Sequence, residues 1–403
     1  MAKIKVLEAF SGIGAQAKAI TNLQKEGILS FKIIGTIDWD VRAIISYAAI
    51  HNNLWKKYKG TLKSNKLDSE EQIDKFLNNF NLSLNGKTKS FILRKDYFFK
   101  QILAAAILLS KNLGDITSVD VQKINKLKPD LITYSFPCQG LSIANMGRAK
   151  GIMNEESTSS LVWNIYKILE SLKHKPKYLL MENVKNLLSN KFIDQYKLWL
   201  KNLENMGYQT YTTTINALNC GSIQKRERVF AISIYKPDRY FLNDDLDFSE
   251  HISELCNLEK LDFVKRKEKF NEIFNFRLNN EENTNALINN TPSRIRLVNE
   301  SKIINNSKDF IINTVTTKQD RIPCCGVVEH DNDKENKLKH RFLTPREAFM
   351  LMGFESTDFD KLLPFIEKNI LTKEVLYRQA GNSIVVQVIE KIFKLINNKE
   401  KNE

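Results

Sequence analysis

Strand-like and helix-like segments alternate along much of the chain, and this alternation narrows the choice of fold. Short apolar runs predict strands at residues 5–10, 33–37, 131–134, 178–181, 211–215 and 229–234. Apolar residues at helical spacing predict helices at residues 15–23, 41–51, 161–172, 344–352 and 384–395. Alternating β and α units favour an α/β fold, in which helices cover both faces of a largely parallel sheet.

Two stretches break this alternation. Residues 55–111 are rich in Lys and Asn and mostly helical in pattern, whereas residues 236–337 are polar, rich in Asn and poor in strand-like alternation. We therefore predict a larger domain and a smaller one. The larger domain comprises residues 1–235 and 338–403, with a helical insertion at about 52–112, and the smaller domain comprises residues 236–337.

The composition gives an electrostatic clue to the partner. Lys and Arg total 61 against 47 Asp and Glu, which leaves a formal charge of +14. This charge is either spread over solvated surface or attracts a polyanion, because phosphate neutralisation supplies most non-specific affinity for nucleic acids. Both interpretations stand at this point.

Other features bear on location and on metals. The longest apolar stretch, residues 102–109, is too short to span a bilayer, which needs about 20 residues. The first residues run into a strand-like segment without an apolar leader. The five cysteines are scattered without metal-ligand spacing, so we expect no disulfide framework, no structural zinc and no other metal. We expect a soluble, reduced, intracellular protein that does not bind membranes.

A glycine-rich turn, FSGIGA, follows the first predicted strand and opens a helix. Gly12 and Gly14 permit a tight turn and a close approach of a ligand to the free N–H groups of the helix. Asp38, at the end of the second predicted strand, is placed to accept hydrogen bonds from a ribose, and Trp39 could stack on a purine. With Ala17 the glycines also fit the pattern of dinucleotide-binding oxidoreductases, which remain an alternative.

The segment SFPCQ follows a strongly apolar strand and carries Cys138. Open α/β sheets bind their ligands at the carboxyl ends of strands, and Pro137 restricts the backbone that aims the thiol. Cys220, by contrast, is interpreted as a small buried apolar residue.

Two polar segments occupy comparable positions. The apolar strand YLLMENV delivers Glu182 at its carboxyl end. The segment QKRER lies between two predicted strands, and alternation would place Gln224, Arg226 and Arg228 on one face.

Taken in order, the segments FSGIG, SFPCQ, MENV and QKRER resemble the cytosine-C5 methyltransferase family. The blocks RFLTPRE, MGF and QAGNSIV near the carboxyl terminus extend this resemblance. The catalytic half is similar to the CpG-specific methyltransferases of wall-less bacteria, which also carry an insertion after the second helix. The resemblance implies a methyltransferase fold, a catalytic larger domain that binds S-adenosylmethionine, and a smaller target-recognition domain.

The resemblance implies a role for each catalytic residue. Cys138 corresponds to the nucleophile that adds to C6 of cytosine, because C5 alone is too weak a nucleophile. Glu182 corresponds to the carboxyl group that contacts N3 and the exocyclic amine. Arg228 corresponds to the arginine at cytosine O2, with Arg226 directed at a phosphate or at Glu182.

The resemblance also implies cofactor and DNA contacts. The residues expected around S-adenosylmethionine are Phe10, Gly12, Gly14, Asp38, Trp39, Asp115, Ile116, Pro137, Leu161, Asn382, Ser383 and Val385. In the loop of residues 139–160, the residues expected at DNA, where the target base must be flipped out of the duplex, are Gln139, Ser142, Ile143 and Asn145. Relatives carry an arginine at the end of this loop, where the chain reads STSS, and Arg148 or Lys150 are candidates to replace it.

Base recognition is expected in the smaller domain. The segment NTVTT resembles an anchoring element, and side chains able to read base edges follow it. The recognition candidates are Gln224, Thr316, Lys318, Gln319 and Arg321. We expect a monomer that acts on double-stranded DNA in the bacterial cytoplasm, in association with the nucleoid, with a cognate restriction endonuclease as a candidate partner. Methylation of tRNA by the same chemistry remains the alternative.

Overall fold

The computed structural model describes residues 3–141, 150–237, 241–274, 281–305 and 309–402. The chain divides into two compact units. Unit 1 comprises Met1–Ile215, Glu227–Ser253 and Ile392–Glu403, and unit 2 comprises Asn216–Arg226 and Glu254–Lys391. This division differs from the expected boundaries of 236–337 for the smaller domain. Unit 2 also contains residues 216–226 and 338–391, and residues 236–253 belong to unit 1.

Unit 1 is built on a six-stranded sheet with the order β2-β1-β3-β4-β7-β5. The expected α/β class and largely parallel sheet are confirmed: β1 pairs in parallel with β2 and β3, and β3 pairs in parallel with β4. β7 is antiparallel to β4. The strands are β1 (Ile4–Ala9), β2 (Phe31–Ile37), β3 (Leu131–Tyr134), β4 (Tyr178–Val184), β5 (Tyr208–Asn216) and β7 (Glu227–Tyr235).

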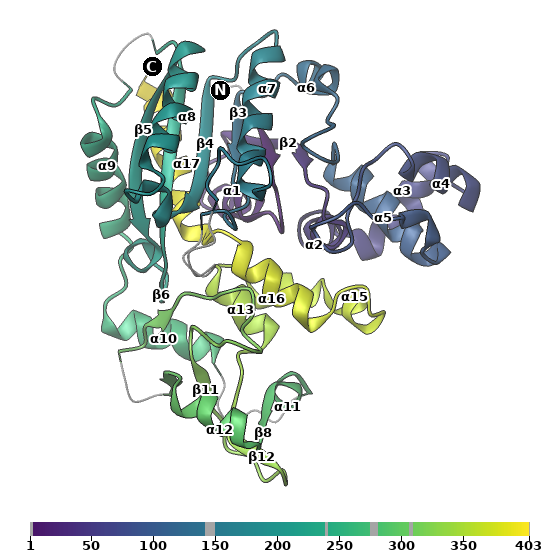
Figure 1. Cartoon of the computed structure of the whole chain (residues 1–403), viewed down its shortest axis with the longest axis vertical. Helices are drawn as coiled ribbons and strands as arrows, with labels where there is room; N and C mark the ends of the chain where they lie inside the picture. Colours follow the sequence, from purple (N-terminus) through teal and green to yellow (C-terminus); the bar gives the residue numbers. More distant parts are fainter. Residues whose placement is uncertain (1–2, 142–149, 238–240, 275–280, 306–308, 403) are drawn as a thin grey trace. The chain divides into compact units, whose positions relative to one another are not determined.

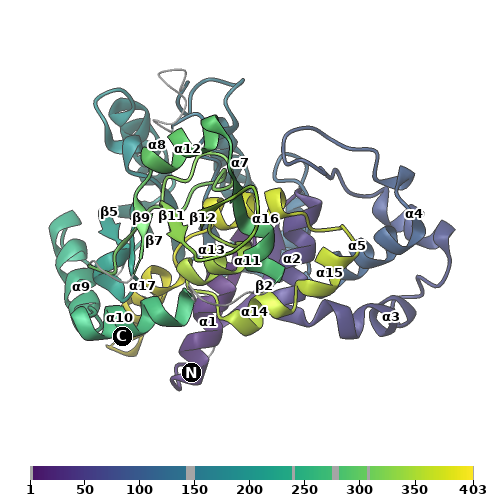
Figure 2. The same ribbon diagram turned by 90° about the horizontal axis from the view of Figure 1, so that it is seen from below.

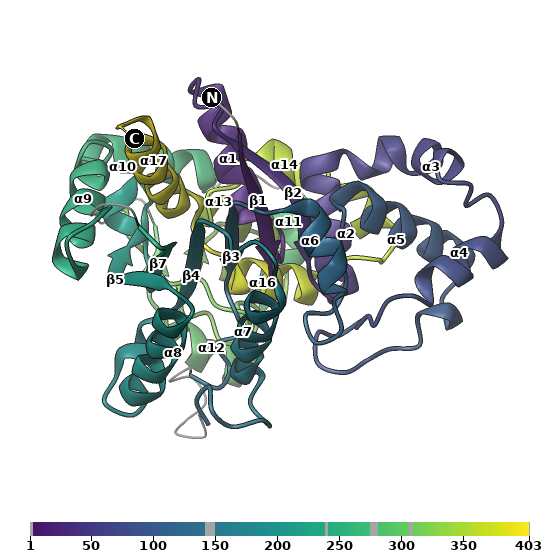
Figure 3. The same ribbon diagram turned by 90° about the horizontal axis from the view of Figure 1, so that it is seen from above.

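Helices cover both faces of this sheet, as the alternation of elements predicted. Figure 3 shows α1 and α17 on one face and α7 and α8 on the other. The helices are α1 (Ala15–Lys25), α2 (Val41–Asn52), α6 (Val121–Leu127), α7 (Val162–Ser171), α8 (Ile193–Asn205), α9 (Asp245–Asn257) and α17 (Val386–Asn402), with the short helices η3 (Thr158–Leu161) and η4 (Lys185–Leu188). The short helix η5 (Ala217–Cys220), the end of α9 and the start of α17 belong to unit 2. The final helix packs its Phe393 ring on Phe31 at the start of β2, with 4.8 Å between the ring centroids.

The core of unit 1 lies between the central strands and the helices on the α7–α8 face. Tyr134 of β3 is buried against Trp199 of α8, and Trp163 of α7 packs edge-on against the same indole at 5.5 Å. Burial of such large aromatic side chains stabilises the sheet at the ends of its parallel strands.

The Lys- and Asn-rich stretch after α2 forms a helical extension of unit 1 at the β2 side of the sheet (Figure 1). Its elements are α3 (Leu54–Ser64), α4 (Glu70–Leu77), η1 (Ile92–Arg94) and α5 (Tyr97–Ser110). Lys100 of α5 is buried, and its ammonium group lies 2.6 Å from Glu70 and 2.7 Å from Asp74 of α4. Its charge is therefore paired inside the extension.

Unit 2 contains a four-stranded sheet with the order β8-β12-β11-β9 and a two-stranded sheet of β10 and β6. Figure 2 shows β9, β11 and β12 of the larger sheet. Its strands are β6 (Gln224–Lys225), β8 (Leu287–Asn289), β9 (Ile303–Ile304), β10 (Ile312–Asn313), β11 (Val327–Glu329) and β12 (Lys337–Arg341). Its helices are α10 (Phe263–Ile273), α11 (Glu281–Ala286), α12 (Pro292–Asn299), α13 (Pro345–Leu351), α14 (Ser356–Asp360), α15 (Leu363–Glu367) and α16 (Lys373–Asn382).

The RFLTPRE block stabilises unit 2. The guanidinium group of Arg341 is fully buried and donates to both carboxylate oxygens of Glu347, at 2.8 and 2.6 Å. Glu347 also accepts from the backbone N–H of Thr344, whose hydroxyl caps α13 in return. A paired charge of this kind tolerates burial, whereas removal of one partner would leave the other uncompensated.

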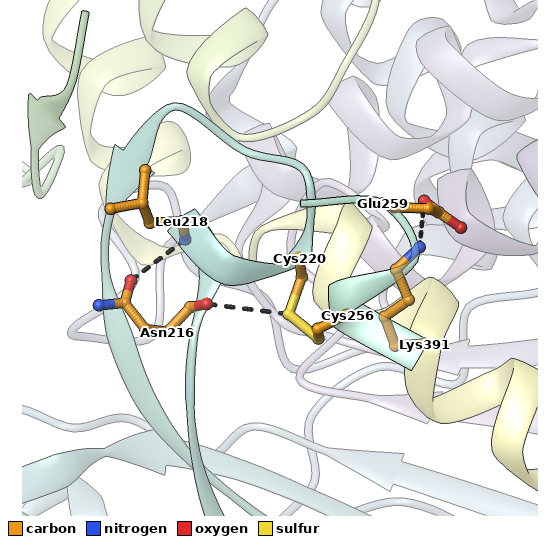
Figure 4. The surroundings of a disulfide bond; sticks show 6 residues. All are labelled: Asn216, Leu218, Cys220, Cys256, Glu259 and Lys391. Atoms are coloured by element: carbon orange, nitrogen blue, oxygen red, sulfur yellow. Dashed lines mark hydrogen bonds and ion pairs between the residues drawn. A yellow bond between two sulfur atoms is a disulfide. The ribbon is translucent and has the colours of Figure 1, made fainter. Parts of the chain in front are cut away.

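Cys220 and Cys256 form a disulfide in unit 2 (Figure 4). Cys220 is buried as expected, but the expectation of a reduced protein without disulfides is wrong. The two residues are 36 positions apart in sequence, yet η5 and the end of α9 bring their Cα atoms to 4.3 Å. Tertiary structure alone creates this proximity. Among the helices of the described residues, none combines the length and the apolar character needed to cross a membrane.

Candidate active site

The register of the parallel strands brings the predicted site segments of unit 1 to one edge of the sheet. Ala9 of β1 pairs with Ile37 of β2 and with Tyr134 of β3, which pairs with Met181 of β4. The residues that follow Ala9, Ile37 and Tyr134 therefore leave the sheet at one level, while β4 continues to Val184 in pairing with β7. This carboxyl edge is where open α/β sheets bind ligands.

The glycine-rich turn after β1 adopts a strained and open conformation. Phe10, Gly12 and Gly14 have φ angles of 56°, 53° and 80°, in the left-handed region. A Cβ atom on Gly14 would lie 2.5 Å from Nε2 of His51, whereas one on Gly12 would meet no atom within 4 Å. Gly14 therefore allows the turn to pack on α2, and Gly12 leaves space for a ligand. Gly14, at the N-cap of α1, offers no side chain, and the Glu8 carboxylate accepts from the N–H of Ala17 in the first turn of the helix at 3.1 Å.

Asp38 ties the end of β2 to this turn. Its carboxylate accepts from the backbone N–H of Gly12 at 2.8 Å and from that of Asp40 at 2.9 Å. Burial, with repulsion from Asp40, raises the pKa of Asp38 to about 6. The neighbouring Trp39 is half-buried.

Asp115 and Ile116 follow a segment that runs beside β2. The backbone N–H of Gly114 donates to Asn112, whose side-chain amide donates to the Thr36 hydroxyl of β2 at 3.1 Å. Asp115 accepts from the hydroxyl of Thr117 at 2.7 Å, and Ile116 is buried. The two predicted residues thus lie on a segment anchored to the end of β2.

Cys138 lies on a loop after β3 that β4 and η4 hold by side-chain amides. The amide of Asn183 donates to the carbonyl of Phe136 at 3.0 Å, and that of Asn186 donates to the carbonyl of Leu141 at 2.6 Å. The thiol itself is half-buried. The loop that carries the predicted nucleophile is therefore fixed on both sides of the cysteine.

Ser159 holds the same loop from the other direction. Its hydroxyl donates to the carbonyl of Pro137 at 2.6 Å and accepts from the N–H of Gly140 at 3.0 Å. A Cβ atom on Gly140 would lie 1.9 Å from the hydroxyl oxygen of Ser157. Sequence reasoning missed both serines, because it treated STSS only as the place of a missing arginine. The available signal was Gly140, close after Cys138. Leu161, a predicted cofactor residue, is half-buried at the end of η3.

Glu182 and Arg228 form the ionic pair of the site. The strand pairing of β4 with β7 places Val184 opposite Arg228, and Nε of Arg228 lies 3.4 Å from Oε1 of Glu182. The Glu182 side chain is 11% exposed and that of Arg228 is 19% exposed, so water screens the pair only partly. A carboxylate and a guanidinium group thus share the end of β4.

Gln224 and Arg226 belong to unit 2 and bind its backbone. Two nitrogens of Arg226 donate to the carbonyls of Val315, Gly381 and Ser383 at 2.8–2.9 Å. The expectation that QKRER forms one alternating face is wrong, because β6 ends at Lys225 and β7, in another sheet, begins at Glu227.

The amide groups of Gln224 and Gln319 are buried, and their assignment as DNA contacts stays a prediction. The amide nitrogen of Gln224 donates to the carbonyl of Leu351 and its oxygen accepts from the N–H of Val315, both at 2.9 Å. Gln319 contacts the thiol of Cys325 and accepts from Thr316. These glutamines anchor the NTVTT segment, whereas Lys318 and Arg321 are exposed.

The remaining predicted residues fall into two groups. Asn382, Ser383 and Val385 lie in unit 2 at the end of α16 and just after it. Ser142, Ile143, Asn145 and Arg148 lie outside the described residues, whereas Gln139 is exposed and Lys150 pairs with Glu156. Among the described residues, no group of three or more His, Cys, Asp or Glu side chains could hold a metal ion.

Comparison with known proteins gives a consistent result. Residues 77–398 match the model of the C-5 cytosine-specific DNA methylase family. The chain is 35% identical to the type II methyltransferase M2.ScrFI of Lactococcus lactis subsp. cremoris, over 97% of this chain and 98% of that one. It is 34% identical to the orphan methyltransferase M.SssI of Spiroplasma monobiae, over 98% and 97% of the two chains.

A solved structure shares the fold. The crystal structure of S. pombe Dnmt2 methyltransferase aligns with a TM-score of 0.64 over the whole of both chains, at 17% sequence identity. An identity this low shows similarity of fold alone.

We expect Ser159→Ala to loosen the loop around Cys138, because it removes hydrogen bonds to Pro137 and Gly140. Loss of about 1–2 kcal/mol should speed amide exchange at Gly140 by about 5- to 30-fold. Hydrogen–deuterium exchange of the peptide spanning Cys138 measures the effect. Ser160→Ala is the matched control, since that hydroxyl bonds only within η3, to the carbonyl of Ser157. Equal exchange in both variants would contradict the assigned role of Ser159.

Proposed function

The chain belongs to the C-5 cytosine-specific DNA methylase family, and we propose that it methylates C5 of cytosine in double-stranded DNA with Cys138 as the nucleophile. The observation that carries this assignment is the arrangement at the carboxyl edge of the sheet. A held cysteine loop follows β3, and the Glu182–Arg228 pair stands at the end of the adjacent strand β4. A thiol, a carboxylate and a guanidinium group are the functional groups that addition to a pyrimidine ring requires.

The residues of unit 1 fit S-adenosylmethionine. The open space at Gly12 and the Asp38 carboxylate suit a nucleoside with polar hydroxyl groups. Phe10, Gly12, Asp38, Trp39 and Asp115 would hold it, and Gly14 would shape the turn. When bound, this cofactor supplies the methyl group. The set that the sequence resemblance implies also includes Ile116, Pro137, Leu161, Asn382, Ser383 and Val385.

Cys138 acts first in this mechanism. Its thiolate adds to C6 of cytosine, forming a C–S bond and shifting electron density to C5, which then is reactive enough to be methylated. Removal of the C5 proton by a base afterwards allows the C–S bond to break and releases the cysteine. The hydrogen bonds of Asn183 and Ser159 to the loop would hold the sulfur in line with the ring.

Glu182 and Arg228 stabilise the charge that develops in the ring. We assign the Glu182 carboxyl group to N3 and the exocyclic amine, and the Arg228 guanidinium group to O2. Because the two side chains pair at 3.4 Å, Arg228 also orients the carboxylate. Donors preorganised in this way contribute about 10²–10³-fold to rate. For Arg226, which donates to carbonyls within unit 2, the partner that the resemblance implies stays a phosphate or Glu182.

Substrate access and recognition complete the proposal. A cytosine stacked in a duplex cannot reach Cys138, so the base must be flipped out, and Gln139 with the loop that follows it would contact the DNA. Residues 236–337 would select the sequence, with Lys318 and Arg321 exposed for contact, while the excess positive charge attracts DNA. We expect a monomeric enzyme in the bacterial cytoplasm, acting on nucleoid DNA. A partner endonuclease stays open, because one relative is named a type II enzyme and another an orphan.

The alternatives have less support. Membership of a DNA methylase family replaces the oxidoreductase interpretation of the glycine turn. The family description names DNA as substrate, and nothing in the described residues favours tRNA. Assays with plasmid DNA and with tRNA, using labelled S-adenosylmethionine, test this choice directly.

We expect Cys138→Ser to abolish methyl transfer while binding of DNA and cofactor persists, because a hydroxyl is far less nucleophilic than a thiolate at neutral pH. The measurement is covalent trapping on DNA that contains 5-fluorocytosine, which cannot lose its C5 substituent. Cys324→Ser removes another free thiol and is the control that should trap normally. Trapping by the Cys138→Ser variant at the wild-type level would overturn the assignment.

We expect Asp38→Ala to weaken binding of S-adenosylmethionine by about 10- to 150-fold, since a charged hydrogen-bond partner contributes about 1.5–3 kcal/mol. The pH dependence follows from the pKa of about 6 for Asp38. The carboxylate is charged and able to accept above this pH, so wild-type affinity should fall as the pH drops below about 6.

Titration calorimetry of wild type, Asp38→Asn and the surface variant Asp120→Ala separates the causes. The asparagine variant should bind weakly with a flatter pH profile. Burial raises the pKa of Glu8 to about 7, and wild type and Asp38→Asn both contain this residue. The difference between their pH profiles therefore reports on Asp38. If Asp38→Ala and Asp120→Ala bind S-adenosylmethionine with equal affinity, Asp38 is not a cofactor contact.

We expect Arg321→Ala to relax sequence choice at one base pair and to cost about 1–3 kcal/mol at the preferred site. Arg321 is exposed and pairs with Glu374 at 2.5 Å, which orients its guanidinium group. Bisulfite sequencing of a methylated random library reads the motif, with Lys318→Ala as the comparison. A phosphate contact would instead weaken all sequences equally and lower the salt slope by about one. An unchanged motif in the Arg321→Ala enzyme would move recognition elsewhere.

A further inference from the structure

A strip of the helical extension, residues 80–90, pairs directly with one predicted cofactor segment. The N–H of Ser83 donates to the carbonyl of Trp39 at 2.8 Å, and the N–H of Val41 donates to the carbonyl of Ser83 at 2.9 Å. The same pairing appears as a parallel bridge between Asp40 and Ser83. Arg42 adds a side-chain hydrogen bond to the carbonyl of Leu84. The strip thus lies beside residues 39–41 and pairs with their backbone like a short parallel strand.

The strip is internally bonded and its central residues are buried. Leu82 and Ser83 are 1% and 0% exposed. The Ser83 hydroxyl donates to the carbonyl of Thr88 at 2.6 Å, and the N–H of Ser90 donates to the carbonyl of Leu82 at 2.9 Å. Because these internal hydrogen bonds limit the motion of the strip, it can hold the segments that it contacts in fixed positions.

The beginning of the strip contacts the other predicted cofactor segment. The Phe80 ring packs on Gly114, where a Cβ atom would lie only 3.1 Å from Phe80, and Gly114 has a φ angle of 89°. The amide of Asn81 donates to the hydroxyl of Ser118 at 3.0 Å. Phe80 and Asn81 therefore contact residues on both sides of Asp115.

We propose that residues 80–90 are a positioning element of the cofactor site, which sets the spacing between Trp39 and Asp115. This inference rests on the proposed function, in which these two residues hold the adenosine part of S-adenosylmethionine. Phe80 and Ser83 act through Trp39 and Asp115 and need not touch the ligand. The extension is thereby part of the catalytic unit's binding site, and its removal would disturb the adenosine end first.

The test is the variant Phe80→Ala in the full-length protein, measured by titration calorimetry with S-adenosylmethionine. We expect an affinity about 5- to 30-fold weaker than wild type, because the ring no longer supports Gly114. Phe98→Ala is the matched control: it removes the same side chain from the same extension, where Phe98 packs on Trp55 and Tyr58. This control should lose thermal stability while its cofactor affinity stays within about twofold of wild type.

Kinetics distinguish positioning from general structural damage. Phe80→Ala should raise KM for the cofactor while kcat at saturating cofactor and DNA affinity stay near wild type. Phe80→Leu should restore most of the affinity, and Asn81→Ala, a milder change at the surface, should weaken it by about threefold. The inference is overturned if Phe80→Ala binds normally, or if Phe98→Ala loses as much affinity. A wild-type protein that binds no S-adenosylmethionine would instead refute the proposed function, and the inference with it.

Discussion

The shared register of β2, β1, β3 and β4 is the constraint on which the candidate site depends. Ala9 pairs with Ile37 of β2 and Tyr134 of β3, so the loops after β1, β2 and β3 start at one level. Tyr134 pairs in turn with Met181, which precedes Glu182 in β4. A slip of one residue in any strand would turn its side chains to the opposite face. Strand register does not determine the position of the loop that carries Cys138. The hydrogen bond from the Asn183 amide to the Phe136 carbonyl holds this loop in place. Backbone pairing aligns the ends of the strands, and side-chain amides then position the loop that carries Cys138.

The glycine turn is held at an electrostatic cost. Glu8 of β1 accepts from the N–H of Ala17 and from the Tyr47 hydroxyl, while Asp38 accepts from the N–H of Gly12. Burial raises the pKa of Glu8 to about 7 and that of Asp38 to about 6, so each carboxyl group is harder to ionise than in water. Hydrogen bonds from backbone N–H groups offset only part of this penalty. Carboxyl groups with raised pKa values collect at functional sites, and here they bracket the turn proposed to bind the cofactor.

Local pattern predicted the elements, and tertiary contacts decided what the pattern left open. Buried strands such as β3 and the first part of β4 are mostly apolar, and Glu182 near the end of β4 and Cys138 after β3 stand out from them. Polar side chains gave no comparable signal. Gln224 and Gln319 looked suited to reading bases, but the fold buries their side chains, and Ser159 looked unremarkable but its hydroxyl holds the loop of Cys138. The disulfide of Cys220 depends on a contact across 36 residues, which no local spacing reveals.

The segment QKRER shows why a sequence motif can serve two structural units. Unit 2 includes the chain up to Arg226 and unit 1 resumes at Glu227, so the motif crosses the boundary in a single step. On one side Arg226 binds carbonyls of the NTVTT and QAGNSIV segments, and Gly381 lets the backbone at Thr316 approach where a Cβ atom would lie only 2.5 Å away. On the other side Arg228 pairs with Glu182. The spacing of the two arginines is therefore dictated by the passage between units, because an added or lost residue would move one guanidinium group away from its partners.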